Sequence, residues 1–174
     1  IKVIEGRRYV NLQTGEIFYM DTSNQTRLDN LKSTKQTMKK LRRLVAHNFT
    51  GGSNQLWVTL TYREHVTSPT LIYKDFKAFI RKLRASFGNV EYIAVIEPQA
   101  SGRWHLHVLL KNDSTLLIPN EDMAKLWSKG FTKTKRLRRA DKVGNYLIAY
   151  LSNLQIGDEN STNKAIVKGA RLYM

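Results

Sequence analysis

Two short β-forming segments with a tight connection between them constrain this chain more than any other feature. Residues 91–97 (EYIAVIE) and 103–111 (RWHLHVLLK) are rich in the β-branched and aromatic residues that favour strands. The five residues at 98–102 that separate them include a proline and a glycine, which are typical of a turn. A connection this short has no room for a crossover, so the two strands must pair antiparallel.

The elements around this hairpin predict an α+β fold. Before the hairpin, the pattern predicts a strand at 56–62 and a helix with one apolar face at 73–87. After it, the pattern predicts a helix at 120–129 capped by Asn120 and ended at Gly130, a strand at 131–137, a helix at 141–154 and a last strand at 164–174. This order predicts a central antiparallel β-sheet with flanking helices.

The first part of the chain reads as a separate unit. Residues 8–20 predict a hairpin and residues 26–48 a long basic helix, before the glycines of 51–53 interrupt the pattern. We therefore divide the chain into an accessory segment at 1–53 and a main domain at 54–174. Because the chain starts at an isoleucine and stops abruptly after a predicted strand, we expect it to be a fragment, truncated at the C-terminus.

The charge of the chain indicates a polyanionic partner. Lys and Arg number 29 against 14 Asp and Glu, which gives a net charge of +15. Such an excess favours nucleic acid first and an anionic membrane surface second, the alternative being a solvated basic surface. The absence of cysteine excludes disulfides and thiolate zinc sites. No apolar run approaches the roughly 18 residues of a membrane span, and we expect a cytoplasmic protein without a membrane partner.

The most informative triplet is His105-Leu106-His107. In a strand, residues i and i+2 point to the same face, which puts the two Cα atoms about 7 Å apart. Glu97 lies at the end of the partner strand, where it can add a carboxylate. Two imidazoles and a carboxylate accept Mg²⁺, Mn²⁺ or Zn²⁺. The alternative is a pair of surface histidines on an amphipathic strand.

A pair of tyrosines is the second candidate feature. Tyr146 and Tyr150 are four residues apart, so both hydroxyls lie on one face of the predicted helix. Tyrosine can act as a nucleophile that forms a covalent intermediate. The alternative is that both rings belong to the core, beside Leu147 and Leu151.

Basic residues form two clusters. The cluster that precedes the tyrosine helix consists of Lys133, Lys135, Arg136, Arg138 and Arg139. The cluster on the long basic helix consists of Lys39, Lys40, Arg42 and Arg43. We predict that both contact DNA phosphates, which give affinity without sequence information. The alternative is a solubilising face.

Taken together, these motifs resemble the HUH endonucleases, and within them the rolling-circle replication initiators of bacterial plasmids and phages. The first motif of that family resembles residues 57–62 (WVTLTY), and its histidine motif resembles His105-Leu106-His107 with an upstream acid at Glu97. Its tyrosine helix resembles residues 146–150 (YLIAY). The match covers roughly residues 54–154 and keeps the order of the motifs.

The resemblance implies a metal-dependent nickase of single-stranded DNA with a ferredoxin-like fold. Glu97, His105 and His107 would hold Mg²⁺ or Mn²⁺, and a tyrosine would attack phosphorus to give a 5′-phosphotyrosine and a free 3′-OH. The partners implied are single-stranded DNA at a replication origin and a host helicase. The family often has a lysine three residues after the nucleophile, where this chain has Ala149 and Asn153. The polar Asn153 favours Tyr150 as first nucleophile, with Tyr146 as its partner.

Other functions compete with this interpretation. A non-catalytic module that binds single-stranded nucleic acid would explain the charge and the aromatic residues, but it needs neither the metal cluster nor the tyrosine pair. A transposase or a conjugative relaxase would use the same chemistry. The histidine motif precedes the tyrosines here, and this order argues against a typical relaxase. A zinc hydrolase would use the histidines and leave the tyrosines without a role.

Overall fold

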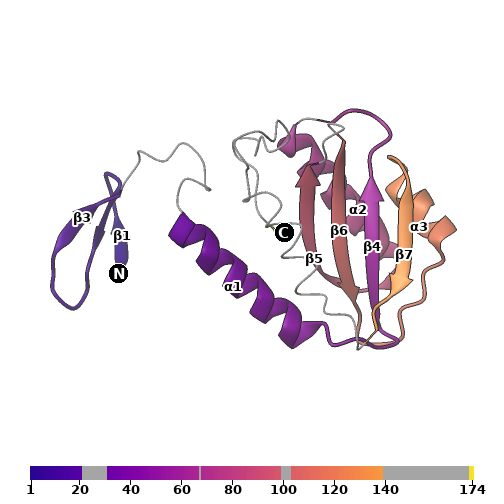
Figure 1. Cartoon of the computed structure of the whole chain (residues 1–174), viewed down its shortest axis with the longest axis horizontal. Helices are drawn as coiled ribbons and strands as arrows, with labels where there is room; N and C mark the ends of the chain where they lie inside the picture. The colour runs from indigo at the N-terminus through magenta and orange to yellow at the C-terminus, as the bar shows by residue number, and fades with distance from the viewer. Residues whose placement is uncertain (21–30, 67, 99–102, 139–172) are drawn as a thin grey trace.

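The computed structural model describes residues 1–20, 31–66, 68–98, 103–138 and 173–174, and its centre is a four-stranded antiparallel sheet (Figure 1). The strands are β4 (Gln55–Thr61), β5 (Glu91–Pro98), β6 (Trp104–Lys111) and β7 (Thr132–Arg136), in the order β5-β6-β4-β7. The parallel strands β4 and β5 have β6 inserted between them, as in a ferredoxin-like split βαβ unit. The predicted α+β class, with a central antiparallel sheet flanked by helices, is confirmed.

One face of the sheet forms the main core with two helices. Helix α2 (Pro69–Phe87) and helix α3 (Asn120–Trp127) lie behind the sheet in Figure 1. The side chains of β6 that point to this face are buried, among them Leu106 and Val108, and they pack with Phe79 of α2 and Trp127 of α3. Burial of alternate residues sets which way every strand faces.

The other face is partly covered by a helix from the N-terminal part of the chain. Helix α1 spans Leu31–Asn48, and its buried residues share a second core cluster with the sheet. Its members are Met38, Leu41, Val45, Phe49, Trp57, Ile93, Val95, Leu109 and Leu137. The helix was predicted over 26–48, and residues 26–30 lie outside the described part of the chain. The division at residue 53 stays a prediction.

The remaining N-terminal residues form a small sheet of their own. Strands β1 (Lys2–Ile4), β2 (Arg8–Val10) and β3 (Ile17–Tyr19) pair antiparallel in that order. The predicted hairpin corresponds to β2 and β3, and β1 adds a strand to it. No helix in the described part of the chain is long and apolar enough to cross a membrane.

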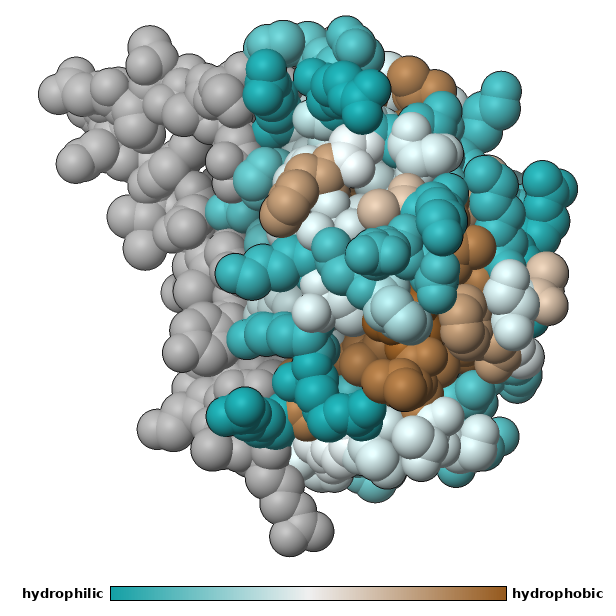
Figure 2. Space-filling view, turned by 90° about the vertical axis from the view of Figure 1, so that its right-hand side faces the viewer, coloured by the Kyte–Doolittle hydropathy of each residue, from teal (hydrophilic) through white to brown (hydrophobic). Residues whose placement is uncertain are grey.

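The surface on the side of β7 and α3 is mostly hydrophilic, with one hydrophobic patch (Figure 2). Exposed large apolar side chains of the described residues include Leu117 at 71% and Phe131 at 67%. A hydrophilic surface agrees with the excess of Lys and Arg in the sequence. Single exposed apolar residues are common on soluble domains and indicate no site by themselves.

Two helix starts differ from the prediction. Helix α2 begins at Pro69, four residues before the predicted start, because Ser68 caps it with its side chain and proline suits the first helical turn. The expected cap of α3 is wrong: Pro119 occupies the cap position, and Asn120 donates from Nδ2 to the Thr132 carbonyl of β7. Helix α3 also ends earlier, at Trp127, with Ser128 in the left-handed conformation.

The alternation of β6 can be tested by stability. Leu106 is fully buried and Leu117 is 71% exposed. Because a buried leucine leaves a cavity when truncated, Leu106→Ala should lower the free energy of unfolding by about 2–5 kcal/mol. The matched control, Leu117→Ala, should stay within about 0.5 kcal/mol of the wild type. Urea denaturation followed by circular dichroism measures both, and equal losses would contradict the assignment of faces.

Candidate metal centre

Pairing of β5 with β6 brings three ligand-type side chains together. In the register of these strands, Glu97 stands directly opposite His105, and Val95 stands opposite His107. All of these residues have the same parity, so their side chains leave the face of the sheet opposite to α2 and α3. We refer to this side as the histidine face.

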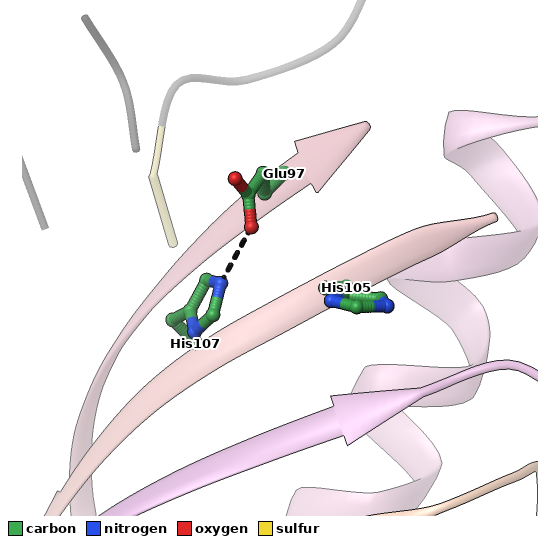
Figure 3. Close-up of side chains that lie close together, drawn as sticks. All are labelled: Glu97, His105 and His107. Atoms are coloured by element: carbon green, nitrogen blue, oxygen red, sulfur yellow. Dashed lines mark hydrogen bonds and ion pairs between the residues drawn. The ribbon is translucent and has the colours of Figure 1, made fainter. Parts of the chain in front are cut away.

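The three side chains are close enough to share one ion (Figure 3). One ligand atom from each of Glu97, His105 and His107 lies within 4.8 Å of the other two. Nε2 of His107 is 2.8 Å from Oε2 of Glu97, and the two imidazole centroids are 6.4 Å apart. Because two ligands on an ion with bonds of about 2.1 Å are at most about 4.2 Å apart, small side-chain movements suffice. The residues therefore fit a divalent ion.

The cluster is sheltered from water on one side. The side chain of His107 is 6% exposed and that of Glu97 is 13% exposed. Burial is the largest influence on His105 and lowers its pKa below the ordinary value of 6.5, while the Glu97 charge opposes this shift and His107 adds to it. A lowered pKa keeps the imidazole of His105 neutral at pH 7, as metal coordination requires.

Trp57 links the cluster to the basic strand β7. Its ring meets His107 edge-on, with centroids 6.2 Å apart, and Nζ of Lys135 lies 5.2 Å from the centre of the same ring. Sequence analysis placed Trp57 in a strand but gave it no part in the site. Its alternation with Thr59 and Thr61 was visible, but its neighbours depend on the order of the strands.

The structure separates the basic residues predicted to contact DNA. Lys133 pairs with Thr59, which pairs in turn with His107, so Lys133 and Lys135 lie on the histidine face. Arg136 has the opposite parity, and its guanidinium donates to the carbonyls of Gly52 and Ser53. Arg138 is exposed, and Arg139 lies outside the described residues.

The basic cluster of α1 lies apart in sequence from these strands. Its residues are Lys39, Lys40, Arg42 and Arg43, and all four are exposed. They alternate with the buried stripe of Met38, Leu41 and Val45, so they point away from the sheet.

Tyr146 and Tyr150 lie outside the described residues, so their position relative to the cluster stays a prediction. Tyr62 follows Thr61, the cross-strand partner of His105, but its side chain is buried in the main core. Its hydroxyl donates to Oδ2 of Asp75 at 3.3 Å, and burial together with that carboxylate raises the pKa of Tyr62 above its usual range. A buried phenol that stays protonated is a poor nucleophile, so Tyr62 does not compete with the predicted pair.

Comparison with known proteins points to DNA replication. Residues 55–155 match the family model of the replication-associated protein ORF2. The Phasyl DNA replicon protein arp of Escherichia coli is 29% identical over 147 residues, which cover 70% of this chain and 50% of that protein. The chain thus spans about half the length of this curated relative. No solved structure matches.

Metal binding can be measured directly with Mn²⁺. His107→Ala should weaken Mn²⁺ binding by at least about tenfold, because it removes one of three proposed ligands. The control is His65→Ala, which removes an exposed histidine outside the cluster. Since the pKa of His105 is lowered from 6.5, the affinity should persist to pH 6.5 and decline only below it. Titration by electron paramagnetic resonance gives both results, and equal effects of the two variants would contradict the site.

The two faces of β7 give a second prediction. Lys133→Ala should lower the affinity for single-stranded DNA by roughly two- to fivefold and reduce the slope of log K against log salt by about 0.7. Arg136→Ala removes the same charge from the same strand, but that side chain is held by loop carbonyls. Its slope should match the wild type in fluorescence anisotropy. A larger effect at Arg136 would overturn this assignment.

Proposed function

Because this chain belongs to the replication-associated protein ORF2 family, we propose that it initiates DNA replication by nicking one strand of DNA at an origin. The proposal includes membership of the HUH endonucleases and a rolling-circle mode of replication. Its single-stranded DNA substrate is the polyanion that the net charge of +15 favours. The nick would supply the 3′-OH from which synthesis starts, and a host helicase would separate the strands.

One observation carries this proposal: Glu97, His105 and His107 converge on a face of the sheet that also carries lysines. A structural role would not require two imidazoles and a carboxylate to meet at one point. Phosphoryl transfer depends on neutralising phosphate charge and on positioning, more than on a strong base. The histidine face offers both, since Lys133 lies in the same cross-strand row as His107.

The proposed cofactor is Mg²⁺ or Mn²⁺, held by Glu97, His105 and His107. A bound divalent ion there supplies Lewis-acid polarisation of the scissile phosphate. Without the ion, His107 donates its Nε2 proton to Glu97, and that proton must leave when Nε2 becomes a ligand. The mixture of imidazole and carboxylate ligands suits Mn²⁺ better than Mg²⁺, which prefers oxygen ligands.

The proposed nucleophile is Tyr150, with Tyr146 as its partner in a second transfer. The phenolic oxygen forms a bond to phosphorus and loses its proton, and the bond from phosphorus to the 3′ oxygen breaks. The 3′ oxygen leaves with a proton as a free 3′-OH, and the 5′ end stays on the enzyme as a phosphotyrosine. One phosphodiester replaces another, so a later 3′-OH can reverse the step.

The experiment that tests this function is a search for a covalent adduct. The protein is incubated with Mn²⁺ and a pool of single-stranded oligonucleotides, and a denaturation-resistant protein–DNA product is expected. His107→Ala should form no adduct while it retains most DNA binding, which depends on the basic surface. An adduct without metal would contradict the proposed centre.

The tyrosine variants identify the attacking group. Phenylalanine keeps the ring and removes the oxygen, so Tyr150→Phe should reduce the adduct most and Tyr146→Phe less. The double variant should form none. Tyr19→Phe, a change in an exposed tyrosine of β3, is the matched control and should react like the wild type. Mass spectrometry of the adduct peptide names the residue directly.

Three outcomes separate the alternatives. A nick without an adduct on either tyrosine would replace the tyrosine by a metal-activated water and favour a hydrolase. DNA binding without any nick would favour a non-catalytic binding module. Strand joining at mobile-element ends in place of an origin would favour a transposase.

A further inference from the structure

A second basic surface lies on the opposite side of the sheet from the histidine face. Side chains of α2, Tyr92 of β5 and Met174 line an open groove of about 870 Å³, which we call the α2 groove. Tyr92 pairs with Leu110 on the core side of the sheet, so the groove and the metal cluster are on different faces. The proposed nicking reaction makes no use of this groove.

The walls of the α2 groove are cationic. Four basic residues recur on one side of α2 at helical spacing, and all of them line the groove: Lys74, Lys77, Arg81 and Arg84. From first to last they span ten residues, or about 15 Å along the helix. No acidic side chain is among the lining residues. A row of four cations without counter-charge is costly unless a polyanion lies along it.

Aromatic rings and one fixed guanidinium complete the groove. Arg84 lies over the ring of Tyr92 at 5.8 Å, and its Nε donates to the Val90 carbonyl at 3.1 Å. Phe76 meets Tyr92 edge-on, with centroids 5.2 Å apart, and holds the ring in place. A cationic groove with half-buried rings and a stacked guanidinium is the arrangement that binds single strands, in which bases stack and phosphates follow the cations.

The volume of the groove favours a single strand over a duplex. A space of about 870 Å³ accepts a few nucleotides of an extended strand, whereas a duplex is too wide to enter it. Glu97 and Tyr92 stand on the same strand, about 17 Å apart along it and on opposite faces. A strand that passes around the β5 edge could therefore contact both places.

We propose that the α2 groove binds the sugar-phosphate backbone of single-stranded DNA that flanks the segment held on the histidine face. This inference rests on the proposed function for the identity of the nucleic acid. The groove adds affinity for long strands and takes no part in bond breaking. It gives the excess of positive charge on α2 a specific ligand.

Equilibrium binding without metal tests the groove separately from nicking. Affinity is measured by fluorescence anisotropy with oligo(dT) of increasing length, at several salt concentrations. The double variant Lys77→Ala/Arg81→Ala should weaken binding of long strands by roughly tenfold and lower the salt slope by about 1.4. The shortest strands that still bind should lose no affinity, because they fill only the histidine face.

The adjacent residue Lys82 provides the matched control. It is an exposed cation on α2 that does not line the groove, so Lys82→Ala should leave the salt slope unchanged. Arg81→Ala removes the same charge one residue away and should lower the slope by about 0.7. All replaced side chains are exposed, and an unchanged melting temperature checks that each variant folds.

Each outcome decides one question. Equal slopes for Arg81→Ala and Lys82→Ala, or an effect on duplex DNA alone, would overturn the groove as a single-strand site. Loss of adduct formation on saturating short oligonucleotides in Lys77→Ala/Arg81→Ala would also overturn it, because the groove would then belong to the nicking site. A wild-type protein that binds long strands through the groove but never nicks would overturn only the proposed function.

Discussion

The register of β5 against β6 is the constraint on which the candidate site depends. Glu97 meets His105 across the pair, and Leu106 between the two histidines is fully buried on the opposite face. A slip of one residue would turn both imidazoles into the core and Leu106 out to water. Apolar burial on the face of α2 and α3 therefore holds the ligand set together, although none of the ligands belongs to that core.

The histidine face combines an apolar part with a charged part. Toward α1 it carries Trp57, Ile93 and Leu109, which are buried with residues of that helix. Toward the end of β5 it carries the carboxylate and the imidazoles, and along β7 it carries lysines. The apolar part removes water from the cluster, which lowers the pKa of His105 and strengthens interactions with any charge that enters. The packing of α1 therefore affects the chemistry of the site as well as its stability.

Local patterns were enough to predict the strands and helices of the main domain in the described part of the chain, but not their ends. Strands β4 to β7 match their predicted ranges to within a residue or two. Helix α2 starts early because Ser68 and Pro69 precede its apolar stripe, and the search for periodicity began only at the stripe. Asn120 has the chemistry of a cap but instead bonds to β7, a partner that is close only after folding.

The sequence by itself determined the class of fold, the antiparallel hairpin and the shared face of His105 and His107, because these follow from the two-residue period of a strand and from a short turn. Tertiary structure decided the rest. The distance from His107 to Glu97, the contact of Trp57 with Lys135 and the diversion of Arg136 to loop carbonyls all join strands that are far apart in sequence. Strand order sets such contacts, and strand order depends on how the whole apolar surface is buried, which no local pattern records.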